Sequence, residues 1–328
     1  TLRNNNSVTF SENSAYCGST SSGRGGAIMG SMITLSNNGS VTFSENSANG
    51  IIARGGAIAG NMITLSDNGN VTFSGNTATA PTSNPPNGTY GGAIYTTGDL
   101  KIRNNASVLF EKNAEIVNGI YRLRSIYASK TGDNWYSVSL SAATGKSIEF
   151  RDSVYIYDSI SLVLNAEYTD TDGKTHLQTG DIIFTGATTE ADLLQVKGRA
   201  GTADEVLNSR TTEIYALTML YGGRLRVEDG AVYKGHGIRT IKDSDSTIRV
   251  KDAILDHAGY TIRLNSGTTL ELEGANKITA SNLEMDDGSS INFVLDSDNL
   301  NQNALTLSGN LILNGDIQIQ LSGDYSLG

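Results

Sequence analysis

The sequence predicts an all-β protein, a right-handed, three-sided parallel β-helix with protruding loops. Three observations predict this fold: motifs that recur along the first third of the chain, apolar residues that alternate with polar ones over short segments, and an unusual composition. The 328 residues include 37 glycines and only 3 prolines. No segment keeps apolar residues at helical spacing long enough to suggest a substantial amphipathic helix.

Two motifs recur near the start of the chain. Gly-Gly-Ala-Ile occurs three times and Phe-x-x-Asn four times, and successive phenylalanines are 33, 30 and 37 residues apart. Residues 32–48 and 62–78 are nearly identical. Such a period indicates one supersecondary unit per repeat, stacked on its neighbours. The motif residues are Gly25, Gly26, Ala27, Ile28, Gly55, Gly56, Ala57, Ile58, Gly91, Gly92, Ala93, Ile94, Phe10, Asn13, Phe43, Asn46, Phe73, Asn76, Phe110 and Asn113.

Each repeat contains three short segments with strand character. In the second repeat these are residues 56–59, 62–66 and 70–74. Val71 and Phe73 alternate with Thr72, which places the two apolar side chains on one face. Residues 67–69, Asp-Asn-Gly, are of types that tolerate left-handed backbone geometry in turns. Three strands per repeat predict one coil of the β-helix, with about 4.8 Å between coils.

Stacked coils give every motif a structural role. We expect the phenylalanines and the motif isoleucines to form ladders inside the core, and the asparagines to stack at a corner, where each amide bonds the coils above and below. The paired glycines allow a sharp turn or a close approach that a Cβ would obstruct. A phosphate-binding loop is not predicted, because no helix and no Lys-Ser/Thr pair follows the glycines. Threonines 34, 42, 64 and 72 are expected to face outward.

One repeat carries an insertion, residues 79–90, with all three prolines of the chain. Proline cannot donate to a strand ladder, so this segment is predicted to protrude as a loop. Exposed loops on rigid scaffolds often carry recognition, which makes this the candidate binding loop. Its candidate residues are Pro81, Asn84, Pro85, Pro86, Asn87 and Tyr90.

The repeat motifs fade after residue 120, yet the alternation continues to Leu321. We interpret residues 1–119 as coils with the repeats, 120–216 as a middle region with longer loops, and 217–328 as C-terminal coils, all within one continuous domain cut at both ends. Residues 190–213 have mixed charge and weak periodicity, and they are predicted to form a long irregular loop that can include one helical turn.

The composition limits the possible partners. The net charge is −10 and the pI about 4.8, and no basic stripe is present, so nucleic-acid binding is not expected. Cys17 is the single cysteine, so no internal disulfide can form. Residues 1–328 contain no signal or membrane-spanning segment, and we expect any such segment to lie outside them.

Residues 55–58 (GGAI) followed by residues 73–76 (FSGN) resemble the repeats of the chlamydial-type polymorphic membrane proteins, a family of autotransporters. Residues 147–157, 179–186 and 217–230 look like the middle region of that family. Residues 304–323 are similar to the last β-helical rungs of many autotransporter passengers. Chlamydial members are often rich in cysteine and this chain is not, so a disulfide cross-linked envelope is not implied.

The resemblance implies a passenger domain at the bacterial cell surface or outer membrane, or secreted after cleavage, with a C-terminal translocator barrel in the full-length protein. It also implies adhesion to host cells through a surface receptor or a glycan. We therefore expect an adhesin or host-interaction scaffold that has no catalytic activity, no cofactor and no direct membrane insertion. A further alternative is a passenger with a purely architectural function, a stalk that carries a terminal domain.

Parallel β-helices also host glycan hydrolases and lyases, so an enzyme is the main alternative. Gly235-His236-Gly237 is similar to a motif of pectin-degrading hydrolases, but the acidic motifs that should precede it are missing. Glycoside hydrolysis needs two carboxylates across the scissile bond. Asp243, Asp245 and Asp252 are near in sequence, whereas the single Asp-Asp pair, residues 286–287, follows the histidine. Two or more carboxylates that converge within a cleft beside His236 would overturn the adhesin in favour of the enzyme.

Other chemistry has little support in the sequence. The three histidines, His176, His236 and His257, lie in no recognisable nucleophile context. A transition-metal site is not predicted with so few histidines and one cysteine. The acidic turns at residues 170–173 and 243–245 leave calcium binding open, although the later ligands of a calcium loop are absent.

Overall fold

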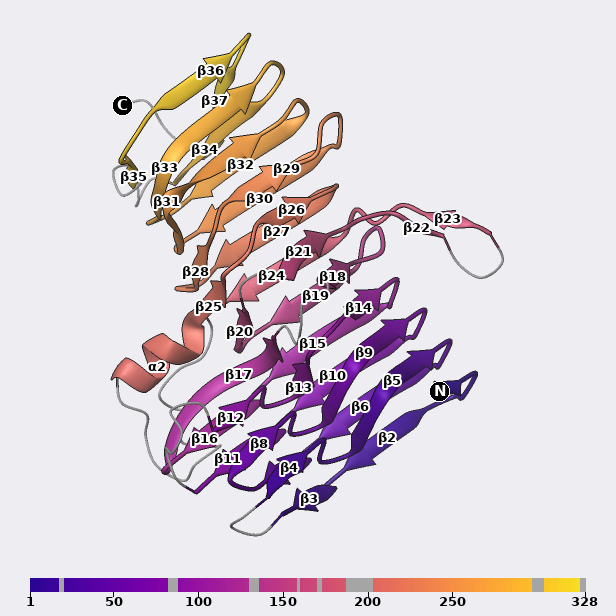
Figure 1. Ribbon diagram of the computed structural model, residues 1–328. Coiled ribbons are helices and arrows are strands. Elements are labelled where there is room, and N and C mark those ends of the chain that lie inside the picture. Colours follow the sequence, from indigo (N-terminus) through magenta and orange to yellow (C-terminus); the bar gives the residue numbers. More distant parts are fainter. Residues whose placement is uncertain are drawn as a thin grey trace.

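The computed structural model describes residues 1–17, 21–81, 88–129, 136–157, 160–169, 173–186, 203–296 and 304–324. The chain winds as a stack of coils, from indigo at the N-terminal end to yellow at the C-terminal end (Figure 1). Successive coils contribute strands to three walls, and within each wall the strands of neighbouring coils pair in parallel and in register. This confirms the predicted three-sided parallel β-helix.

The first wall carries the Phe-x-x-Asn motifs. Several of its strands show strict alternation of buried and partly exposed residues, as in Ser40–Ser44 and Ser107–Glu111. The strands are β2 (Val8–Ser11), β6 (Ser40–Ser44), β10 (Asn70–Ser74), β15 (Ser107–Glu111), β19 (Ser147–Phe150), β24 (Asp181–Thr185), β27 (Gly223–Glu228), β30 (Ser246–Lys251), β32 (Thr268–Glu273), β34 (Ser290–Asp296) and β37 (Gln318–Asp324).

The second and third walls follow in each coil, and four long strands turn the corner between them: β5 (Ile28–Ser36), β9 (Ile58–Ser66), β31 (Ile254–Leu264) and β33 (Lys277–Asp286). The second wall also contains β13 (Ile94–Thr96), β17 (Ile120–Ala128), β20 (Ser153–Ile156), β25 (Thr211–Ile214), β28 (Val232–Gly235) and β35 (Ala304–Leu307). The third wall also contains β1 (Leu2–Arg3), β14 (Leu100–Arg103), β18 (Tyr136–Ser141), β21 (Ile160–Leu164), β26 (Thr218–Leu220), β29 (Ile238–Thr240) and β36 (Leu311–Asn314).

The repeats near the N-terminus form larger coils than the three predicted strands account for. Between the first and second walls they add short parallel strands. These are β3 (Ser14–Tyr16), β7 (Ser47–Asn49), β11 (Thr77–Ala80) and β16 (Ala114–Val117), and, further out, β4 (Ser22–Arg24), β8 (Ile52–Arg54) and β12 (Thr89–Tyr90). Phe43 and its partner Phe73 are 30 residues apart, whereas Ile248 and its partner Leu270 are 22 apart. The extra strands therefore explain the longer period.

One core runs through the stack, and its walls are ladders of like residues. The predicted phenylalanine ladder is present and has two further members, with ring centroids 4.7 to 5.1 Å apart: Phe10, Phe43, Phe73, Phe110, Phe150 and Phe184. Ile28, Ile58, Ile94 and Ile126 are in register on the second wall. Fully burying each such side chain stabilises the fold by roughly 1.5–3 kcal/mol.

Two elements depart from the solenoid. A small hairpin, β22 (Tyr168–Thr169) and β23 (Thr175–His176), projects from one side, and helix α2 (Ala203–Arg210) lies on another side near β17 (Figure 1). Residues 187–202 lie outside the described residues. The prediction of an irregular loop up to residue 213 is wrong at its end, because α2 has eight residues and β25 begins at Thr211 and pairs with β20.

Candidate functional site

The asparagines of the repeats form a ladder at the corner after the first wall. Asn46 Nδ2 donates to Asn76 Oδ1 at 2.9 Å, and Asn76 Nδ2 donates to Asn113 Oδ1 at 2.8 Å. Each carbonyl oxygen also accepts the backbone N–H of the preceding asparagine in the ladder, as in Asn46 N to Asn76 Oδ1 at 3.1 Å. With all hydrogen-bonding groups satisfied inside the wall, these amides hold the corner and do not face a ligand.

The paired glycines lie where two layers of backbone meet. Gly25, Gly55 and Gly91 have φ between 57° and 68°, the left-handed region that glycine adopts freely. A Cβ on Gly56 would lie 2.1 Å from the carbonyl oxygen of Gly92. The double glycine therefore serves close packing between coils.

The candidate loop, residues 79–90, is described in part. Asn84, Pro85, Pro86 and Asn87 lie outside the described residues, while Pro81 is exposed after β11 and Tyr90 ends β12. The Tyr90 ring contacts Tyr95 and Tyr127, with centroids 5.7 and 4.6 Å apart. The loop thus returns to the fold beside an aromatic surface.

This surface is a row of outward-facing rings across successive coils, which we call the aromatic row. Neighbouring centroids are 4.2 to 6.1 Å apart. Tyr215 and Tyr260 are 38% and 40% exposed. The row consists of Tyr95, Tyr127, Tyr155, Tyr215, His236 and Tyr260.

Sequence reasoning missed the aromatic row, although a signal for it exists. Tyr127 lies between Ile126 and Ala128, which are both fully buried, so alternation points its ring away from the core. Parallel pairing then aligns Tyr95, Tyr127 and Tyr155 at one register position. An uninterrupted row of partly exposed rings is unusual on the surface of a soluble protein and is typical of a surface that binds a partner.

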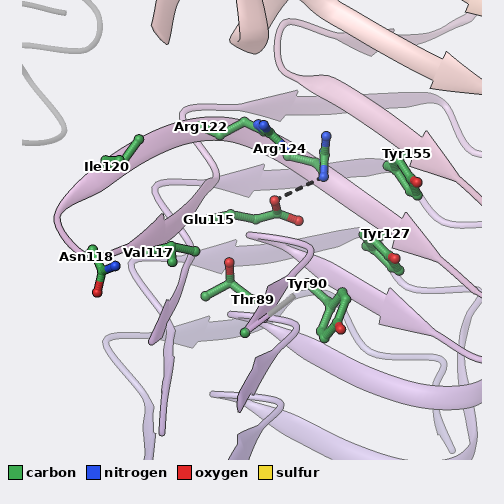
Figure 2. Close-up of a pocket in the computed structure, with 11 residues that line it drawn as sticks. Thr89, Tyr90, Glu115, Val117, Asn118, Ile120, Arg122, Arg124, Tyr127 and Tyr155 are labelled. Atoms are coloured by element: carbon green, nitrogen blue, oxygen red, sulfur yellow. Dashed lines mark hydrogen bonds and ion pairs between the residues drawn. The ribbon is translucent and has the colours of Figure 1, made fainter. Parts of the chain in front are cut away.

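A hollow of about 320 Å³ opens beside the row, and we call it the arginine hollow. Figure 2 shows Tyr90, Tyr127 and Tyr155 on one side of it and the β16–β17 hairpin residues Val117, Asn118 and Ile120 on the other. Burial is the main cause that raises the pKa of the Tyr127 hydroxyl, so this hydroxyl keeps its proton at neutral pH.

An ion pair lies at the base of the arginine hollow. Arg124 Nη1 lies 3.1 Å from Glu115 Oε2, and each side chain is only 5% exposed. Arg124 Nη2 also contacts Glu213 at 3.3 Å, and its guanidinium lies 4.7 Å from the centroid of Tyr155. Glu115 Oε1 accepts the backbone N–H of Gly91 at 2.7 Å. Both acids are thus already engaged, and Arg124 serves to fix the hollow.

A second groove, of about 550 Å³, continues the row toward the N-terminus. The Arg54 guanidinium lies 5.2 Å from the centroid of Tyr95 and 5.7 Å from that of Tyr90. Met29, at the edge of the groove, is 63% exposed. Exposed apolar side chains and a cation over aromatic rings are typical of recognition surfaces.

The Gly-His-Gly motif lies at the far end of the row. The His236 ring stacks on Tyr260 at 4.2 Å and lines a hollow of about 190 Å³ together with Glu213 and Asp256. Lys234 pairs in register with Glu213 on one side and Asp256 on the other, so a cation separates the acids. Glu213 binds Arg124 and the Tyr215 hydroxyl, and Asp256 accepts a hydrogen bond from Thr279.

The remaining candidates from the sequence do not meet at this site. His257 is buried beneath the wall, accepts a hydrogen bond from Gly237 N at 3.1 Å, and burial lowers its pKa to about 4. His176 stacks on Tyr168 in the projecting hairpin. Asp243, Asp245 and Asp252 lie on turns near the first wall, and residues 170–172 are outside the described ones.

Among the described residues, no group of three or more His, Cys, Asp or Glu side chains is placed to hold a metal ion. Helices with the length and hydropathy needed to cross a bilayer do not occur in the described part of the chain.

Comparison with known proteins gives one match. Neither the curated proteins nor the solved structures include a significant match to this chain. The model of the Chlamydia polymorphic membrane protein repeat matches residues 7–31 and 70–97. Both matched segments contain a Phe-x-x-Asn motif and reach a Gly-Gly-Ala-Ile motif, and the structure stacks them as coils of one β-helix. These two segments are therefore similar to repeats of the Chlamydia polymorphic membrane protein family.

Proposed function

We propose that this chain is an adhesive passenger, which contacts a host-cell surface through the side of its β-helix and catalyses no reaction. The matched repeats imply an autotransporter context, and thus display at the outer membrane. The observation that carries the proposal is the aromatic row, which crosses successive coils of the second wall beside two hollows. A rigid wall with repeated contacts gains affinity by multivalency.

Adhesion can be tested with beads that carry the purified chain. We expect such beads to bind cultured epithelial cells, and the double variant Tyr215→Ser/Tyr260→Ser to bind several-fold less, because both exposed rings are lost from the row. The matched control is Tyr16→Ser, which removes a tyrosine that is 78% exposed and outside the row. Failure of the unchanged chain to bind any cell would favour an architectural stalk.

A glycan-processing enzyme is the second candidate, and one observation favours it. Glu213 and Asp256 line the hollow beside His236, two coils apart. Two coil spacings amount to about 9.6 Å, close to the separation of roughly 6.5–9.5 Å in inverting glycosidases. Both acids are hydrogen-bonded and separated by Lys234, and the hollow is smaller than most ligand sites, so adhesion is preferred.

The two candidates are separated by assay for new reducing ends or unsaturated products from a panel of polysaccharides. Adhesion without catalysis predicts no product with the unchanged chain. Product formation that is lost in both Glu213→Gln and Asp256→Asn, but kept in Asp245→Asn, would establish the enzyme. Asp245 is an exposed acid on a turn outside the hollow.

A further inference from the structure

The arginine hollow contains a cation, Arg122, whose nearby carboxylates are in direct contact with another arginine. Among the described residues, the Arg122 guanidinium makes no ion pair and no hydrogen bond, while Glu115 and Glu213 are both bound to Arg124. Burial, and then the charge of Arg124, lower the pKa of Arg122. A half-buried arginine with this environment is stabilised by any anion that enters the hollow.

The basic character extends along the wall. A further hollow of about 320 Å³ shares Arg122 and Arg124 with the first and is lined also by Lys234 and Lys277, which are exposed. Its acids are Glu213 and Asp256, so four cations face two carboxylates. The whole chain has a net charge of −10, and this strip therefore opposes the overall charge. Such a local reversal favours an anionic ligand.

Ring faces and hydroxyl groups adjoin these cations. Tyr127 and Tyr155 stack with centroids 4.8 Å apart, and Tyr90 meets Tyr127 edge-on. Tyrosine offers an apolar face and a polar tip to a ligand that has both kinds of surface, as a sugar ring does. The buried Thr89 side chain also lines the hollow and adds a hydroxyl to it. Along the aromatic row, such platforms repeat at the coil spacing.

Peptide and nucleic-acid partners fit this strip less well. An extended peptide commonly adds to an unpaired strand edge, but β17, β20, β25 and β28 pair with a strand on both sides. Nucleic-acid binding needs a long basic surface, and the net charge of −10 repels the phosphate backbone.

From these observations we propose that the arginine hollow binds an anionic sugar residue of a glycan chain, with Arg122 bound to its sulfate or carboxylate and the neighbouring sugars lying on the aromatic row. The inference rests on the proposed adhesive function and names the chemical class of its ligand. Arg124 is a positioning residue, because its guanidinium is held by Glu115 and Glu213.

The direct test is calorimetry of the purified chain with three probes: a sulfated heparin oligosaccharide, a carboxylated hyaluronate oligosaccharide and a neutral chitin oligosaccharide. We expect one or both anionic probes to bind, more weakly as salt rises, and the neutral probe to bind much more weakly. Preference for the first probe identifies sulfate as the anion, and preference for the second identifies carboxylate.

Variants separate the hollow from general charge attraction. Arg122→Gln should weaken binding of the preferred probe about tenfold or more, since a charge-assisted contact is lost. Arg239→Gln removes an equal charge from an exposed position on β29 and should change binding less than about twofold. Equal losses in the two variants, or a neutral probe that binds as tightly as the anionic ones, would overturn the proposal.

Cell binding distinguishes this inference from the function on which it rests. If beads with Arg122→Gln adhere as well as the unchanged chain, adhesion stands and the anionic-sugar site is refuted as its basis. If the chain binds an anionic oligosaccharide through Arg122 but adheres to no cell, the sugar site stands and the adhesive function falls.

Discussion

Asn113 and Asp152 form the step at which the asparagine ladder ends in a carboxylate. Asn113 Nδ2 and the Asn113 backbone N–H both donate to Asp152 Oδ2, at 3.0 and 2.9 Å. Ser125 Oγ donates to the same oxygen at 2.8 Å, and Lys112 N donates to Oδ1 at 2.8 Å. Asp152 is only 3% exposed, so a group that can carry charge is enclosed at a position where earlier coils have a neutral amide.

This burial predicts a pH-dependent stability. Burial raises the pKa of Asp152 from 3.8 to about 6, although its four hydrogen bonds act in the opposite direction. The folded chain thus holds a proton that the unfolded chain releases between about pH 4 and pH 6. Stability from this group is present below pH 4 and is lost as pH rises through 6, by about 3 kcal/mol in total.

The matching variant is Asp152→Asn, which has no charge at any pH. Urea unfolding of both chains at about pH 4 and about pH 7 should show the variant gaining roughly 3 kcal/mol relative to the unchanged chain over this interval. A stability difference that stays constant with pH would mean that Asp152 is ionised throughout in the folded state.

We expect a substitution within the asparagine ladder to lower the free energy of unfolding substantially. Asn76 is fully buried, and Asn76→Ala removes the acceptor of the Asn46 backbone N–H and of Asn46 Nδ2. It also removes the side-chain donor to Phe43 O and one of the two donors to Asn113 Oδ1. Each unsatisfied buried group costs about 1–3 kcal/mol, so we expect a loss of about 3 kcal/mol or more in the free energy of unfolding. Asn70→Ala on the exposed face of the same coil is the control and should change it by less than about 0.5 kcal/mol.

The fold could be predicted from the sequence because its core ladders come from repeats of similar length. Phe43 and Phe73 are paired in the structure at the spacing that the motif shows. The short strands β7 and β8 could not be predicted, because three-residue segments such as Ser47–Asn49 contain too few apolar side chains to show alternation.

The candidate site could not be predicted for a different reason. Tyr155 and Tyr215 are neighbours in the aromatic row although 60 residues separate them, because a long excursion lies between β20 and β25. Arg124 and Glu213 likewise meet across 89 residues. Coils of unequal length hide such contacts from a search for periodicity, and the pairing register is needed to find them.

The double glycines give a sharp test of coil packing. Gly56→Ala would place a Cβ 2.1 Å from one backbone oxygen and 2.5 Å from the Thr77 nitrogen, neither of which can move without breaking a strand pairing. We expect it to destabilise the chain by more than about 3 kcal/mol or to prevent folding. In Gly30→Ala the nearest atom is 3.5 Å away, so its melting temperature should stay close to that of the unchanged chain. Similar melting of both variants would show that the two coils are not in such close contact.

The ion pair of the arginine hollow is the last test, since it decides whether the hollow is preformed. Arg124→Gln leaves Glu115 as a buried carboxylate without a counter-ion, and such a change typically costs 3–5 kcal/mol. Glu115→Gln/Arg124→Gln removes both charges and should recover more than half of that loss. Arg151→Gln, which breaks ion pairs of a side chain that is 45% exposed, should cost no more than about 1 kcal/mol. Chemical unfolding of these variants measures the coupling energy between Arg124 and Glu115. If the double variant is no more stable than Arg124→Gln, packing of the guanidinium on Tyr155 holds the hollow in shape, and the pairing with Glu115 does not.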